Sequence, residues 1–142
     1  MTRASAPATY DRPDGDDRAA HQRGTCAAMN EYFDLSRIVE LREALGSDVG
    51  AIVASVLSSM TGAIERAEAA VARGEFDQAT QDAHRARNDA LMLAAGQLQS
   101  ALAELEVAAR DGDETAAEAA LERVQEVWSP TRDALAASVE SG

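Results

Sequence analysis

Apolar residues recur every three or four positions along most of this chain, which is the spacing of one face of an α-helix. The pattern is clearest between Ser47 and Gly74, where the apolar face comprises Ile52, Val53, Val56, Leu57, Met60, Ile64, Ala67 and Val71. No stretch alternates apolar and polar residues as a half-buried β-strand would. The sequence therefore predicts an all-α fold.

Capping residues and glycines place the first helices. Asp34 can cap a short helix that ends at Gly46, where glycine tolerates a left-handed backbone. Ser47 or Asp48 can cap the long helix that follows, and Gly74 can end that helix.

The second half of the chain contains further helical segments. The stretch from Glu75 to Leu98 is predicted to be one amphipathic helix, with a break or bend at Gly96. Another helix runs to Arg110, and a last one begins near Glu114. Because the turns between helices are short, consecutive helices must lie antiparallel. The predicted architecture is an antiparallel up-and-down four-helix bundle with a short extra N-terminal helix.

The first 30 residues have a different composition. Pro7, Pro13, Gly15 and Gly24 interrupt a polar, mixed-charge segment with few large apolar side chains. Such a segment cannot bury enough apolar surface to offset the entropy of ordering it. Residues 1–30 are therefore predicted to be a flexible N-terminal leader, and residues 31–142 to form the helical-bundle domain.

The charge balance excludes several classes of partner. The chain has 25 acidic and 13 basic residues, all of the latter arginine, and a formal net charge of -12. A surface so acidic repels phosphate backbones, so nucleic acid and anionic membranes are not expected partners. No apolar run is expected to be long enough to span a membrane, and the N-terminus lacks the charged-then-apolar order of a secretory signal. The expectation is a cytoplasmic protein, monomeric because one bundle can close its own core.

Motifs for catalysis, cofactors and metals are missing from the sequence. It has no glycine-rich phosphate loop, no Gly-x-Ser-x-Gly and no His-Glu-x-x-His. The single cysteine, Cys26, excludes an intrachain disulfide. A di-iron bundle would require Glu three residues before its histidine, but Gln81 stands there, and Asp82 and Asp89 are predicted to be surface residues. Neither a cofactor nor a metal ion is therefore expected.

His84 is the residue that most suggests chemistry. It is the sole histidine of the predicted bundle, on a polar flank of its helix with Arg87, Asn88 and Leu91. A neutral imidazole is a nucleophile near neutral pH, and it can attack an activated phosphoryl group. Arg87, one turn later, could stabilise the added negative charge.

The pattern around His84 resembles that of histidine phosphotransfer (HPt) domains. The family motif runs Ala-His-x-Leu-Lys-Gly, followed by a Gly-Ala pair and a Leu. The residues in matching places are Ala83, His84, Arg87 for Lys, Leu93, Ala94 for Gly, Ala95 and Leu98. The resemblance extends through the flanking helices and turns, from Asp34 to the Arg-Asp-Gly-Asp turn that starts at Arg110.

This resemblance implies a role in phosphorelay signal transduction. His84 would accept a phosphoryl group from the aspartate of a response-regulator receiver domain, or of a hybrid histidine kinase, and pass it to another receiver. Arg87 would stabilise its charge, and Arg85, Asn88 and Leu91 would belong to the docking surface. The chain would be a stoichiometric carrier and not an enzyme, with Mg²⁺ bound by the receiver partner alone.

Two positions depart from the family pattern and leave an alternative open. Ala86 replaces the usual Leu, and Asn88 replaces the small Gly that lets a receiver approach the ring. The bulkier Asn88 could slow transfer, narrow the choice of partner or mark loss of the reaction. The alternative function is thus a helical adaptor that binds a receiver or kinase domain without carrying phosphate.

Overall fold

The computed structural model describes residues 31–140, and every residue that it assigns to a regular element is helical. The elements are α3 (Leu35–Leu45), a 3₁₀ turn η2 (Gly46–Asp48), α4 (Val49–Ala72), α5 (Phe76–Met92), α6 (Gly96–Arg110) and α7 (Glu114–Glu140). The predicted all-α fold is confirmed. The predicted leader, residues 1–30, lies outside the described residues.

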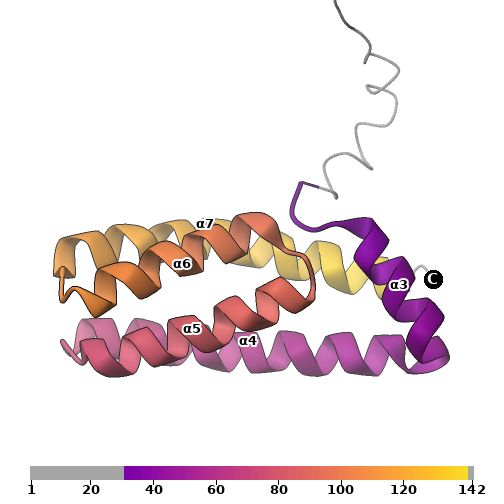
Figure 1. The fold of residues 1–142 in the computed structure, drawn as a ribbon, viewed down its shortest axis with the longest axis horizontal. Helices are drawn as coiled ribbons and strands as arrows, with labels where there is room; N and C mark the ends of the chain where they lie inside the picture. The colour runs from indigo at the N-terminus through magenta and orange to yellow at the C-terminus, as the bar shows by residue number, and fades with distance from the viewer. Residues whose placement is uncertain (1–30, 141–142) are drawn as a thin grey trace, which may run out of the picture. The chain divides into compact units, whose positions relative to one another are not determined.

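Four of these helices form the bundle. Each of α4, α5, α6 and α7 packs against the helix before or after it in the chain, and α4 also packs against α7, which closes the ring. The short turns make neighbours antiparallel, and α3 crosses one end of the bundle near α4 and α7 (Figure 1). The predicted four-helix bundle with a short extra N-terminal helix is therefore confirmed.

The bounds of α3 follow from its capping residues. The Oδ1 atom of Asp34 accepts hydrogen bonds from the backbone N–H of Ser36 at 2.9 Å and from its hydroxyl at 2.7 Å. Gly46 ends the helix with a φ of 61°. Both residues take the places that the sequence predicts.

The three turns between the bundle helices share one backbone geometry. In each, a residue with positive φ follows the helix, and the next residue donates its N–H to the carbonyl five positions back: Glu75 to Ala70, Ala95 to Ala90 and Asp113 to Ala108. This is the Schellman motif, in which glycine is usual because its backbone accepts a left-handed conformation. Gly74 and Gly112 hold that position in two turns, and Ala94 holds it in the third with a φ of 56°.

The prediction of a single helix from Glu75 to Leu98 is wrong. The helix ends at Met92, and Gly96 is the first residue of α6 instead of an interruption within one helix. The turn is held by buried Leu93 and Ala95 and by the N–H of Asp34, which donates to the carbonyl of Ala94 at 3.0 Å. These tertiary contacts end the helix without a glycine.

The core divides into two clusters of buried side chains. Around α3 and the nearby halves of the bundle helices it contains large residues, among them Phe33, Met60, Leu102 and Trp128. Towards the far turns alanine predominates, with Val71, Leu105 and Leu121 as the large residues. The short alanine side chains let α4, α5 and α6 approach one another closely. Polar side chains at the edge of α5 can therefore reach residues of α4 and α6.

The long helix α4 is rich in apolar residues. By length and composition alone, the segment Leu35–Ala72 is able to cross a membrane, contrary to the sequence-based expectation that no run is long enough. In the structure Val53, Met60 and Ala67 of α4 are buried inside the bundle. Length and composition do not distinguish a membrane span from the core helix of a bundle, and the packing gives α4 a place in the core.

Candidate functional site

His84 lies on the solvent-facing flank of α5. Its neighbours in sequence, Ala83 and Ala86, are fully buried and fix the rotation of the helix about its own axis. With that face against α4 and α6, the side chain of His84 is directed outwards and is 51% exposed. The helical spacing predicts this placement.

A buried carboxylate from α6 meets the imidazole. The Nδ1 atom of His84 is 3.0 Å from Oε2 of Glu106, whose side chain is only 8% exposed. Arg87 donates from Nε to Oε1 of Glu106 at 2.8 Å, and Arg110 donates from Nη2 to Oε2 at 2.8 Å. One carboxylate therefore binds the histidine and two arginines.

The charge of Glu106 is maintained by these partners. Burial alone would raise the pKa of its carboxyl group, since the charged form loses solvation. The hydrogen bonds from Arg87 and His84, together with their charges, outweigh burial and hold the pKa below its ordinary value. Glu106 is thus a carboxylate near neutral pH.

The two contacts of Nδ1 require different tautomers of the imidazole ring. Arg87 Nη2 is also 3.0 Å from Nδ1. Nδ1 either carries a proton and donates to Glu106, or lacks it and accepts from Arg87. In the first form the lone pair is on Nε2, which has no hydrogen-bond partner among residues 31–140. In the second form Nε2 carries the proton.

Arg87 is bound to Glu106, a contact that the sequence did not predict. It was predicted to stabilise charge on a phosphoryl group, and in the structure its guanidinium lies beside Nδ1 and is bound to Glu106. Its side chain is 27% exposed, so it borders solvent while bound. Its Nε atom is bound by Glu106, and its Nη2 atom lies against Nδ1 of His84.

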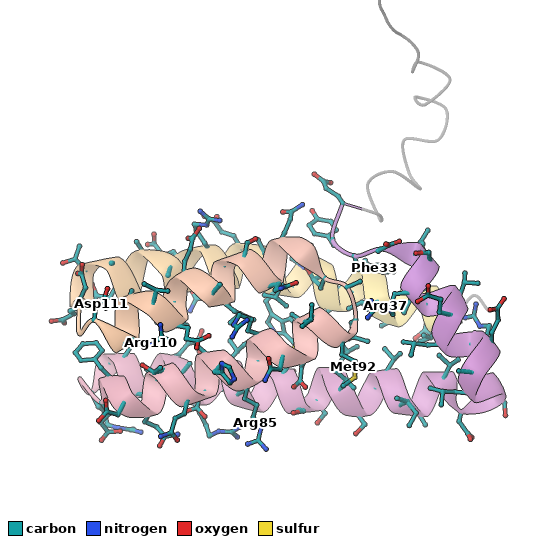
Figure 2. The ribbon with its side chains drawn as sticks, in the orientation of Figure 1. Phe33, Arg37, Arg85, Met92, Arg110 and Asp111 are labelled. Atoms are coloured by element: carbon teal, nitrogen blue, oxygen red, sulfur yellow. The ribbon has the colours of Figure 1, made fainter. Side chains whose placement is uncertain are left out.

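The residues predicted to bind a partner are all exposed. Arg85 and Asn88 are exposed on α5, and Leu91 is 50% exposed one turn further on. Figure 2 shows Arg85 directed away from α6, and no hydrogen bond or ion pair to its side chain is found within residues 31–140. Met92, at 48% exposure, extends the apolar surface next to Leu91.

Asp82 is not the surface residue that the sequence suggested. It is 4% exposed, and its carboxylate accepts hydrogen bonds from Arg66 of α4 at 3.4 Å and from Gln78 at 3.0 Å. The hydroxyl of Ser59 donates to Asp89 at 3.0 Å. The bonds from Arg66 and Ser59 fasten α5 to α4, which gives His84 a fixed support.

Sequence reasoning missed Glu106 and Arg110. Their spacing of four residues on one helix is the one local signal, and such pairs are common on helix surfaces. Glu106 faces His84 because of how α6 is rotated against α5. No local sequence pattern predicts that rotation. Within residues 31–140, no group of three or more His, Cys, Asp and Glu side chains is placed to hold a metal ion.

Comparisons with known proteins give one clear likeness. A scan against protein-family models and a search of curated proteins both gave no match. Among solved structures, the crystal structure of histidine-containing phosphotransfer protein B (HptB) from Pseudomonas aeruginosa PAO1 is similar, with a TM-score of 0.73 and 18% sequence identity. The alignment covers 78% of this chain and 96% of that one. This chain therefore shares the fold of a histidine-containing phosphotransfer protein.

Proposed function

We propose that this chain is a histidine phosphocarrier in a phosphorelay, with His84 as the phosphoacceptor. The observation that carries the proposal is the pairing of a half-exposed imidazole with a buried carboxylate through Nδ1, which leaves Nε2 without a hydrogen-bond partner among residues 31–140. The likeness in fold to a histidine-containing phosphotransfer protein adds support. A stoichiometric carrier needs no pocket, cofactor or metal ion of its own, and Mg²⁺ would be bound by the receiver.

Glu106 prepares the ring for attack. When Nδ1 donates its proton to Glu106, the lone pair of Nε2 is free to act as a nucleophile. The bond that forms joins Nε2 to phosphorus, and the bond that breaks joins phosphorus to the aspartyl oxygen of the receiver, which leaves as a carboxylate. The ring gains positive charge in this step, and Glu106 stabilises it while the proton stays on Nδ1.

Arg87 has a second part in the proposed reaction. The incoming phosphoryl group is more negatively charged than a carboxylate. It therefore attracts the guanidinium of Arg87 away from Glu106 and towards Nε2 of His84. When Arg87 moves, it also stops donating to Nδ1, so Glu106 can hold the Nδ1 proton. The approach of the phosphoryl group thus favours the reactive tautomer of His84.

Exposed residues around His84 form the proposed docking surface for a receiver domain or hybrid kinase. Leu91 supplies apolar area, and Arg85 supplies a cation without an internal partner in the described part of the chain. Arginine and apolar side chains together are typical of the central part of a protein interface. The proposed setting is the cytoplasm, with a monomeric carrier.

The second candidate is the adaptor, which one observation favours. Asn88 is exposed one turn from His84, where the family has a residue without a side chain. Its amide can keep a receiver aspartate away from Nε2 while the rest of the surface still binds. Such a protein would dock a receiver or kinase but transfer nothing.

A transfer assay separates the two functions. One receiver domain is phosphorylated with acetyl phosphate and Mg²⁺, freed of reagent, and mixed with a second receiver in the presence or absence of the chain. A carrier moves phosphate to the second receiver, and His84→Gln abolishes that movement while binding to both receivers persists. Equal phosphate on the second receiver with and without the chain, despite measurable binding, would support the adaptor. Asn88→Gly, if it then restored transfer, would identify the amide as the obstacle.

A further inference from the structure

The site contains a second arginine that the proposed reaction does not use. Arg110, on the last turn of α6, donates to Oε2 of Glu106 at 2.8 Å, and its side chain is 58% exposed. Arg87 occupies the other oxygen, Oε1, at 2.8 Å. The carboxylate is therefore held by one arginine on each oxygen.

Releasing Arg87 would be costly if it were the sole arginine on Glu106. A buried carboxylate that loses its charged partner is left with poor solvation, which disfavours the state in which the partner has moved. The side chain of Glu106 is 8% exposed, so water cannot replace Arg87 fully. Arg110 remains in place when Arg87 leaves, because it approaches from α6 itself and contacts the other oxygen.

We infer that Arg110 is a positioning residue that keeps Glu106 paired while Arg87 moves to the phosphoryl group on His84. This inference rests on the proposed chemistry of His84. Arg110 acts through Glu106 and Arg87 and does not contact the transferred group. Its effect on the rate therefore depends on the presence of Arg87.

The test uses phosphoramidate, a small phosphoryl donor, so that no partner protein is required. The Nε2 lone pair of His84 attacks phosphorus, the P–N bond of the reagent breaks, and ammonia leaves with a proton from solvent. The proton on Nδ1 stays between the ring and Glu106. The rate of acid-labile phosphate formation on the full chain is followed by intact mass.

Four variants are compared with the wild type: Arg110→Gln, Arg87→Gln, the double variant and Arg110→Lys. Arg110→Gln is expected to lower the labelling rate about tenfold, the effect of losing one charged hydrogen-bond partner. In the Arg87→Gln background the same change should lower the rate by less than it does in the wild type, because the arginine that Arg110 helps to release is gone. Arg110→Lys retains a cation and should recover most of the rate.

Arg123→Gln is the matched control. Arg123 pairs with Glu104 at 3.3 Å and its side chain is 53% exposed, much like that of Arg110, but it lies on α7 and does not contact Glu106. Its labelling rate should equal that of the wild type. The Arg123–Glu104 pair is exposed on both sides and adds little to stability, so thermal unfolding of Arg123→Gln should stay close to that of the wild type. Glu106 is buried, but in Arg110→Gln it keeps its bond to Arg87, so this variant should still fold, and cooperative thermal unfolding checks that it does.

Two results would overturn the inference: a wild-type rate in Arg110→Gln, or an equal loss with and without Arg87, which would mean that Arg110 acts on the phosphoryl group directly. A second readout is the Nε–H signal of Arg87 in proton–nitrogen spectra. It should shift on phosphorylation of the wild type and stay unshifted in Arg110→Gln. If chemical labelling follows the expected pattern but no receiver exchanges phosphate with His84, the proposed function fails while the role of Arg110 stands.

Discussion

Glu106 connects the chemistry of His84 to the interior of the bundle. It is a buried residue of α6, yet it contacts a half-exposed imidazole and two arginines. The low polarity around it strengthens each of these bonds relative to the same bond in water. A single carboxylate therefore contacts the ring of His84 and binds both Arg87 and Arg110.

Glu106 should also make the stability of the protein depend on pH. Its pKa in the folded state lies below its ordinary value, so the folded chain binds this proton less readily than the unfolded chain. The resulting stabilisation is present above the unfolded pKa, about 4.3, and is lost as the pH falls through the folded pKa. Urea unfolding between about pH 6 and pH 3 should therefore show the wild type losing stability relative to Glu106→Gln. Parallel curves for the two proteins would mean that the folded protein does not favour the charged carboxylate.

Replacing Ala94 should increase the stability of the protein. Its φ of 56° places a side chain in the left-handed region, where Gly74 and Gly112 occupy the equivalent turns. Ala94→Gly should raise the free energy of unfolding by about 1 kcal/mol, the cost of the left-handed conformation for a residue with a Cβ atom. Chemical denaturation measures this gain.

The reverse change provides the control for Ala94→Gly. Gly74 has a φ of 73°, and a Cβ atom built there meets no atom within 4 Å, so Gly74→Ala tests the backbone conformation alone. It should lower the free energy of unfolding by a similar amount. If both variants changed stability in the same direction, the conformation of these turns would not explain the effect.

At the scale of helices, α6 links the core to the site. Leu102 and Leu105 are fully buried on one face of α6, and Glu106 follows directly on the flank that meets α5. The rotation of α6 is set by the leucines, and this rotation brings Glu106 to His84. Packing of the apolar face thus determines the geometry of the polar site.

Leu102→Ala should lower the free energy of unfolding, because it removes a large side chain from the buried face of α6. Truncation of a fully buried leucine costs about 2–5 kcal/mol, because transfer energy is lost and a cavity remains. Val107→Ala is the control on the same helix, since Val107 is 50% exposed and its truncation should change stability by less than about 0.5 kcal/mol. A loss below about 1 kcal/mol for Leu102→Ala in denaturant titration would contradict its place in the core.

The helix ends show what local sequence can specify. Asp34 and Gly46 bound α3 as their capping preferences predict, because each forms its bond within a few residues. The end of α5 was placed too late, since Ala94 has no local preference for the left-handed conformation. That conformation is imposed by Leu93, Ala95 and the backbone of Asp34, which are tertiary contacts.

At the scale of the whole molecule, the fold was more predictable than the site. Helical periodicity and short turns are sufficient for an antiparallel bundle, and the likeness to a solved phosphotransfer protein agrees with it. His84 could be found because it is the sole histidine of the bundle region. Glu106 and Arg110 could not, because their proximity to His84 depends on how two helices rotate against each other.

The charge of the molecule gives the site a distinct local character. The chain has a net charge of -12, yet Arg87 and Arg110 bind the carboxylate that His84 contacts, and exposed Arg85 follows His84 in the sequence. Arginines on a surface with an excess of acidic residues can attract an acidic partner to their position. This arrangement suits a receiver domain that presents a phosphorylated aspartate.

His84 is proposed to carry a phosphoryl group, and the most direct test is to locate that group on the chain. The chain is incubated with a receiver domain phosphorylated by acetyl phosphate in the presence of Mg²⁺, and the mass of the intact chain and of its peptides is determined under alkaline conditions. One acid-labile phosphoryl group is expected on the peptide that contains His84, and none on the same peptide of His84→Gln. Stable binding of phosphorylated receivers without any label on His84 would contradict it and leave the chain an adaptor.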